Sequence, residues 1–216
     1  MGDHPLARRR TTGLAGLVVA VLFGAGNALW AFEQPDGGAR ARAIVAFYTE
    51  NSGRIIAGGS LSLLASAAFV LFAAGIRGIL RELEGDDLLA TTAFGGALLV
   101  LSAGLAAETI NMVGAQRARD GQLTHELARA VFEISYVFGY NAAGVGIGVL
   151  LLAIATVALR ARALLPGWLA VVLLVVGIAF LTPLSRFLLA PSVLLLAAGS
   201  VGLLRGSFSD AASPTA

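Results

Sequence analysis

Long apolar stretches alternate with short polar segments along the whole chain. A membrane-spanning helix needs about 20 mostly apolar residues, and six stretches of this kind cover residues 12–32, 55–76, 89–114, 130–159, 167–182 and 188–204. The pattern predicts an all-α fold, a polytopic transmembrane bundle of about six spanning helices. The chain then divides into an N-terminal tail at 1–11, a transmembrane domain at 12–205 and a disordered C-terminal tail at 206–216.

The polar segments hold residues that begin and end helices. Residues 34–38 form a turn signal with Pro and Gly, and residues 39–49 predict a short interfacial helix with its apolar side chains toward the bilayer. Further along the chain, Gly85 is predicted to end a helix. Two helices are predicted to start at N-cap residues, one at Asp86 or Asp87 and one at Thr124. Turns are predicted at Asp120-Gly121 and Pro166-Gly167.

Composition agrees with a membrane protein, since 57% of the residues are hydrophobic and 13% are charged, against about 25% charged in soluble domains. The absence of cysteine excludes disulfides and thiolate metal sites. The two histidines, His4 and His125, do not suffice for a multi-histidine zinc or haem site. We therefore expect no metal and no cofactor. A net charge of +2 without a clustered basic face also predicts no nucleic-acid partner, so the expected partner is the lipid bilayer.

Arginines are the guide to orientation, because short cytoplasmic loops carry an excess of Lys and Arg. With the N-terminus inside, eight arginines lie on the cytoplasmic side and seven outside, which is almost no bias. The run Arg8-Arg9-Arg10 directly before the first span decides the prediction. We expect a multi-pass protein of the cell (plasma) membrane with both termini in the cytoplasm.

Two glutamates stand in stretches that otherwise suit lipid. Glu108 lies in the apolar run 98–114, and Glu133 near the start of the run 130–159. An ionised carboxylate is costly in hydrocarbon, so such residues usually face a bundle interior, a partner or a cavity. They are the candidate catalytic residues.

Other polar and aromatic residues fall in the same half of the bundle once the helices are threaded in turn. They are candidates for substrate binding: Asn27, Trp30, Arg54, Asn111, Tyr136, Tyr140, Asn141 and Arg186. The first and third predicted spans run toward this half, while the second and fourth start in it. Trp30, together with Phe32, is expected at the membrane interface, where aromatic side chains collect.

Helical spacing arranges some of these residues on common faces. Glu108 and Asn111 form an i,i+3 pair, and the series Arg129, Glu133, Tyr136 and Tyr140 predicts one stripe that turns inward. Glycines at 139, 144, 146 and 148 would let a neighbouring backbone approach this helix closely.

The last two spans share few residues. Each has about 16 or 17 residues, or roughly 25 Å at 1.5 Å per residue, which is short of a ~30 Å hydrocarbon core. The turn at 183–191 is therefore expected to dip into the membrane with Arg186. Arg186 and Arg54 are then possible partners for either glutamate.

Each candidate also has a structural explanation. Glu133 can form an i,i+4 ion pair with Arg129, and Glu108 can form an interhelical hydrogen bond or pair with Arg186. The tyrosines can serve packing, and Asn27 and Asn111 can link helices.

Three segments resemble parts of uncharacterised multi-pass membrane proteins common in actinobacteria. The segments are FYTENSGR at 47–54, RGILRELEG at 77–85 and LPGWLA at 165–170. The resemblance implies a six-helix membrane fold and supplies no catalytic residue.

The leading functional hypothesis is an acidic and aromatic pocket in one leaflet that binds or modifies a hydrophobic small molecule, an isoprenoid or a lipid. Glu108 would donate a proton and Glu133 would act as second acid or base. Small membrane terpene cyclases are similar in size and in their use of membrane acids. The alternatives are a structural or regulatory protein with buried Glu-Arg pairs, and a proton-coupled carrier.

Overall fold

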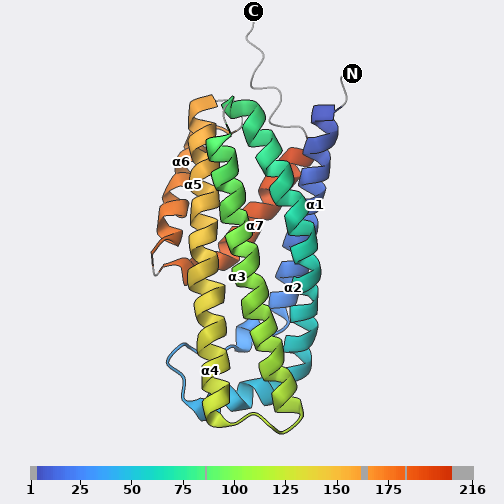
Figure 1. The fold of residues 1–216 in the computed structure, drawn as a ribbon, viewed down its shortest axis with the longest axis vertical. Coiled ribbons are helices and arrows are strands. Elements are labelled where there is room, and N and C mark those ends of the chain that lie inside the picture. Colours follow the sequence, from blue (N-terminus) through green and yellow to red (C-terminus); the bar gives the residue numbers. More distant parts are fainter. Residues whose placement is uncertain (1–3, 86, 162–164, 183, 206–216) are drawn as a thin grey trace, which may run out of the picture.

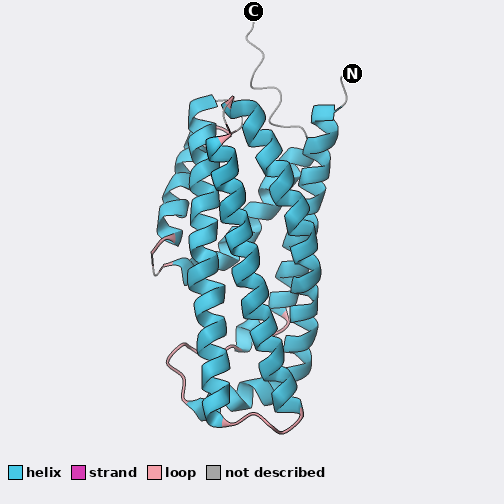
Figure 2. Cartoon of the chain, in the orientation of Figure 1, coloured by secondary structure: helices cyan, strands magenta, loops and turns pink. Residues whose placement is uncertain are grey.

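The computed structural model describes residues 4–85, 87–161, 165–182 and 184–205. Within these ranges the regular structure is helical throughout, and loops lie at the two ends of the bundle and at the last helix–helix turn (Figure 2). The elements are α1 (His4–Ala28), η1 (Ala31–Glu33), α2 (Ala41–Glu84), α3 (Leu88–Arg119), α4 (His125–Tyr136), the π-helical η2 (Val137–Ala142), α5 (Ala143–Ala161), α6 (Gly167–Phe180) and α7 (Ser185–Arg205).

The long helices run side by side along one axis (Figure 1). Helix α1 begins and α7 ends at the same end of the bundle, which we call the proximal end. At the opposite, distal end, α3 leads into α4. Helices α4, η2 and α5 follow one another without a break and return to the proximal end. The predicted all-α helical bundle is confirmed.

Four helices are long and apolar enough to cross a membrane. They cover Ala7–Glu33, Ala41–Glu84, Leu88–Arg119 and His125–Ala161, each with an 18-residue window of mean hydropathy 1.9 or higher. This long, charge-poor character supports a membrane-embedded protein in contact with lipid.

The last two predicted spans form a shorter hairpin. Helix α6 has 14 residues, about 21 Å at 1.5 Å per residue, and is therefore shorter than a ~30 Å hydrocarbon core. Helix α7 is longer than predicted, because it begins at Ser185, continues through Pro191 and has 21 residues, about 31 Å. The turn between α6 and α7 lies only part of the way along the bundle (Figure 1). The hairpin thus covers one side of the bundle near the proximal end and does not reach the distal end.

The predicted interfacial helix at 39–49 is wrong as a separate element. Residues 41–49 are the first turns of α2, which continues without interruption to Glu84. No proline interrupts the chain between the two predicted segments, and Ile44, Phe47 and Tyr48 pack into the protein. Burial in a protein core therefore replaces the expected contact with the membrane surface.

Several predicted helix ends are confirmed. The Thr124 side chain accepts a hydrogen bond from the Leu127 N–H at 3.2 Å and caps α4. Gly85 and Gly121 have φ values of 70° and 67°, a region in which glycine is the default residue. Asp86 lies outside the described residues.

The cap of α3 differs from the prediction. Asp87 occupies the N-cap position without a side-chain cap bond and instead pairs with Arg77 at 2.8 Å. The carboxylate of Glu84 accepts hydrogen bonds from the N–H groups of Leu89 and Ala90, at 3.0 Å each. The end of α2 therefore caps the start of α3.

Glycine pairs set the close approach of neighbouring helices. A Cβ at Gly96 would lie 2.8 Å from the Gly146 carbonyl oxygen, and one at Gly146 would lie 2.7 Å from that of Gly96. Gly26 and Gly58 form a similar contact between α1 and α2. Small residues of this kind let membrane helices pack backbone against backbone, as the glycines at 146 and 148 predicted.

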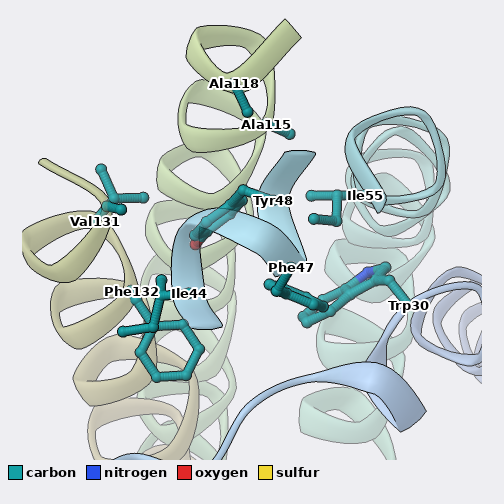
Figure 3. Close-up of a cluster of buried hydrophobic side chains, with 10 residues drawn as sticks. Trp30, Ile44, Phe47, Tyr48, Ile55, Ala115, Ala118, Val131 and Phe132 are labelled. Atoms are coloured by element: carbon teal, nitrogen blue, oxygen red, sulfur yellow. The ribbon is translucent and has the colours of Figure 1, made fainter. Parts of the chain in front are cut away.

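A cluster of buried side chains fills the distal end of the bundle (Figure 3). This distal core consists of Trp30, Ile44, Phe47, Tyr48, Ile55, Ala115, Ala118, Ala128, Val131 and Phe132. Trp30, predicted at the membrane interface, is 6% exposed and packs on Phe47 with ring centroids 6.4 Å apart, so its ring contacts protein; its depth in the membrane stays a prediction. Phe32, in contrast, is 89% exposed.

Candidate functional site

A partly open cavity of about 480 Å³ lies between the helices and is lined by residues of α1, α2, α3, α4, η2, α5, α6 and α7. Its size falls in the range of small-molecule sites, about 300–1,000 Å³. Its polar lining residues are Asn27, Trp30, Gln34, Ser62, Ser66, Glu108, Asn111, Ser135, Tyr140, Ser192 and Ser200. The cavity is therefore a candidate ligand site.

The two parts of the cavity differ in chemistry. Toward the distal end, most of its polar groups gather around Glu108 and Asn111. Toward the proximal end, it is lined mainly by apolar side chains, including Phe69, Phe72, Ile76, Ile79, Leu80, Leu150, Leu151 and Ile154. At 1.5 Å per residue, the stretch of α2 from Ser62 to Leu80 measures about 27 Å. The cavity is therefore long and amphiphilic, with a polar head and an apolar tail.

Glu108 is the acidic residue of this lining. Its side chain is 8% exposed, and its Oε2 atom has no hydrogen-bond partner among the described residues. The Ser62 hydroxyl of α2 is a hydrogen-bonding neighbour of this carboxyl, and a Cβ on Gly59 would lie 3.5 Å from Oε2. A buried carboxyl group is costly unless it is paired, and Glu108 is the acidic residue among those that line the cavity.

Asn111, one turn along α3, is held by the protein. Its Oδ1 accepts a hydrogen bond from the Tyr48 hydroxyl at 2.7 Å and one from the Ser135 hydroxyl at 3.0 Å. All three residues are buried. This network joins α2, α3 and α4 and forms the floor between the cavity and the distal core. Sequence reasoning missed Tyr48, because the segment that contains it looks interfacial.

Tyr140 lies at the side of the cavity on the π-helical segment. Its hydroxyl donates a hydrogen bond to Gln34 Oε1 at 3.1 Å, and its ring packs on Tyr136 with centroids 4.5 Å apart. Gln34 also lines the cavity and belongs to the connection between α1 and α2. The sequence did not indicate Gln34 as a site residue, because a polar residue in a turn segment is typical of a solvated loop. This contact ties the α1–α2 connection to the cavity wall.

The predicted inward stripe on the fourth helix is broken. Glu133 is 52% exposed and pairs with Arg129 at 2.6 Å on the outside of α4. The inner face of α4 is formed by Ala128, Val131, Phe132 and Ser135. The π-helical turn that follows is wider than an α-turn and changes the direction of later side chains. The structure therefore does not bring Glu108 and Glu133 together.

The other predicted site residues separate into two groups. Asn27, Trp30, Asn111 and Tyr140 line the cavity together with Glu108. Tyr136 and Asn141 are not part of its lining, and Asn141 is exposed. The Asn27 side-chain amide donates to the Phe23 carbonyl at 2.9 Å, a bond within its own helix.

The two arginines proposed as partners of the acids have different outcomes. Arg54 is half-exposed and bonds to Glu33 at 2.5 Å and to Asn51 at 3.1 Å. It therefore pairs with the end of η1 and not with either candidate acid. Arg186 lies in the first turn of α7, and its side chain lies outside the described part of the structure.

The arrangement limits the chemistry of the site. Within the described residues, no group of three or more His, Asp or Glu side chains could hold a metal ion. One buried carboxyl faces the cavity, while the second predicted acid is on the outer surface. The site is thus suited to bind a molecule with a small polar head and a long apolar chain.

Comparison with known proteins gives no further guide. No family model, no curated protein sequence and no solved structure matches this chain. The resemblance to actinobacterial multi-pass proteins stays a prediction, and the function has to be argued from the cavity.

Proposed function

We propose that this membrane protein binds a single-chain amphiphile, a fatty or isoprenoid lipid, inside its helical bundle. The observation that carries the proposal is the cavity itself, which is polar around Glu108 and apolar toward the proximal end. Its 480 Å³ correspond to roughly 16 non-hydrogen atoms at about 30 Å³ each, the volume of a water molecule in the liquid. That is the size of one acyl chain or a short isoprenoid.

The α6–α7 hairpin offers the route by which such a chain enters. Helix α7 packs mainly along α1, and α6 packs mainly along α5, while α6 and α7 contact each other only slightly. Both helices nevertheless line the cavity. The seam between them is therefore the least tightly packed wall, and it faces the lipid from which an apolar ligand comes.

The structural alternative requires an interhelical hydrogen bond or a Glu-Arg pair at Glu108, and the Ser62 hydroxyl of α2 stands beside its carboxyl as a hydrogen-bonding neighbour. The described lining of the cavity contains no arginine, and Arg54 is engaged with Glu33. The carrier alternative requires ionisable groups along the path, whereas Glu108 is the ionisable acid of the described lining. Ligand binding thus fits the arrangement better than either.

A blocking substitution tests the proposal. Gly104 lines the cavity, and a Cβ added there meets no atom within 4 Å. Gly104→Phe should fill the tail region without disturbing the helix packing. Gly95 lies on the same helix with equally open surroundings, but it is exposed and does not line the cavity, so Gly95→Phe is the matched control.

Native mass spectrometry of protein purified in mild detergent gives the readout. We expect a single-chain lipid to copurify with the wild type and with Gly95→Phe and to be absent from Gly104→Phe. The same bulk membrane lipids in all three proteins would overturn the proposal. A bound lipid unaffected by Gly104→Phe would do so as well, because it would place the lipid outside the cavity.

A further inference from the structure

An open groove lies between α1 and α2 at the proximal end of the bundle, and it shares no lining residue with the cavity. The groove is lined by Arg8, Ala74, Gly75, Gly78, Arg81 and Glu82. The apolar run of α1 begins after Arg10, and that of α2 ends at Ile76. The charged part of the groove is therefore at the level where membrane helices meet lipid head groups.

The packing of α1 on α2 positions the first cation of the groove. Thr12 lies against Gly75, and the Arg8 side chain lies over Gly78, where a Cβ would be 3.2 Å from Nη1. Arg8 Nη1 donates to the Gly78 carbonyl at 3.5 Å and to Glu82 Oε1 at 2.6 Å. The Nε and Nη2 groups of Arg8 donate to no described residue, and the side chain is 41% exposed. Arg8 is thus held in place with donors left for a ligand.

Arg81 is the second cation of the groove. Its side chain is 68% exposed, and its Nε lies 3.9 Å from Asp87 Oδ1, beyond hydrogen-bond distance. Asp87 instead bonds to Arg77 at 2.8 Å. The Arg81 guanidinium therefore donates no hydrogen bond to a described residue. A guanidinium has five N–H donors in a planar fork that fits phosphate oxygens.

The charges of the two ends favour an anionic ligand here. The groove holds two arginines and one acid, Glu82, which Arg8 already neutralises. At the proximal end as a whole, the described arginines are Arg8, Arg9, Arg10, Arg77, Arg81 and Arg160, against Glu82, Glu84 and Asp87. At the distal end, the described arginines Arg40, Arg42, Arg54, Arg117, Arg119 and Arg129 are matched by Glu33, Asp36, Glu50, Asp120, Glu126 and Glu133. Positive charge is thus in excess at the proximal end (Figure 1).

We propose that this groove binds an anionic phospholipid of the surrounding bilayer, whose phosphate accepts hydrogen bonds from Arg8 and Arg81. Basic pockets between membrane helices bind lipid phosphates in this way. The acyl chains of the lipid follow the apolar helices toward the distal end. A zwitterionic lipid has no net charge to compensate the excess arginine, so the groove selects the anionic head. The site is separate from the cavity and does not depend on the proposed function.

Native mass spectrometry of the full-length protein, delipidated in detergent and titrated with one lipid at a time, measures the selectivity. The probes are phosphatidylglycerol, phosphatidylcholine and phosphatidylethanolamine with the same palmitoyl and oleoyl chains, and soluble glycerol phosphate. Arg81→Gln removes the loosely paired cation, and Arg81→Lys keeps its charge. Arg119→Gln is the matched control, because Arg119 is exposed at the distal end of α3 and forms no ion pair with a described residue. Melting temperatures show that each variant is folded.

We expect phosphatidylglycerol to bind about fivefold or more tightly than the two zwitterionic lipids. Arg81→Gln should weaken its binding about fivefold, the contribution of one arginine near a membrane surface. Arg81→Lys should retain most of the binding, and Arg119→Gln and Gly104→Phe should leave it unchanged.

Four results would overturn the inference. Equal losses in Arg81→Gln and Arg119→Gln would show a general effect of charge, and loss in Gly104→Phe would place the lipid in the cavity. Equal binding of the three phospholipids, or tightest binding of phosphatidylethanolamine, would remove the anionic selectivity. Binding of glycerol phosphate as tightly as phosphatidylglycerol would show a phosphate site and not a lipid site.

Discussion

Two polar residues one turn apart on α3 have opposite surroundings. Asn111 accepts hydrogen bonds from Tyr48 and Ser135 at the edge of the distal core. Glu108, with the Ser62 hydroxyl beside it, is the acidic residue of the cavity lining. The distal core is filled with packed side chains, whereas the region beside it is hollow. The comparison teaches that one helix contributes a packed hydrogen-bond network and, one turn away, the wall of a cavity.

The largest expected effect comes from the filled region. Phe132 is 1% exposed within the distal core, so Phe132→Ala should lower the free energy of unfolding by about 3–5 kcal/mol through lost burial and a cavity. Unfolding by denaturant in mixed micelles measures this. Phe138→Ala, at a residue that is 39% exposed, is the control. Equal losses in both variants would show that the distal core has no special role.

Asn111→Leu should have the next largest effect. The substitution leaves the buried hydroxyls of Tyr48 and Ser135 without their acceptor, which should cost about 1–3 kcal/mol of unfolding free energy. A double-mutant cycle with Tyr48→Phe should show coupling, because the second change removes one of the stranded groups. Strictly additive losses would contradict the hydrogen-bond network.

Glu108→Leu should shift stability in the opposite direction. Without ligand, removing an unpaired buried carboxyl should raise the unfolding free energy by about 1 kcal/mol or more. The same variant should lose the copurifying lipid, because the carboxyl group that lowers the stability of the empty protein is the group proposed to bind the lipid. A marked destabilisation of the ligand-free protein would instead show that Glu108 has a protein partner, as the structural alternative requires.

Glu133→Gln should have the smallest effect. The residue is half-exposed, and its ion pair with Arg129 is at the surface, where such pairs contribute little. We expect an unchanged melting temperature and unchanged lipid content by native mass spectrometry. Loss of lipid comparable with that in Glu108→Leu would restore the two-acid mechanism that the structure does not support.

The candidate site was partly predictable from the sequence. Glu108 stood out because a carboxyl in a long apolar run needs an explanation, and Asn27, Trp30, Asn111 and Tyr140 follow from tracing each helix to the same half of the bundle. Ser62 could have been found by counting inward along the second span, which places it near the depth of Glu108. However, serine is a common small residue in this apolar helix, which also contains other serines, so its sequence position alone does not mark Ser62 as a site residue.

Glu133 shows why the remainder could not be predicted. It has the same apolar neighbourhood in sequence as Glu108 and a regular spacing to Tyr136 and Tyr140. Periodicity shows which residues share a face but not which face points inward, and a π-helical turn changes the register within one continuous helix. Only the packing of α4 on α2 and α3 distinguishes the inside from the outside.

The sequence by itself determined the properties that depend on composition and local conformation. These are the helical membrane fold, the helix ends at Gly85, Gly121 and Thr124, and the short helix α6, because each follows from apolar length, backbone freedom or side-chain capping. The tertiary structure decided the continuation of α2 into the distal core, the outward position of Glu133 and the cavity. These depend on which surfaces meet, a balance of packing between segments far apart in the chain.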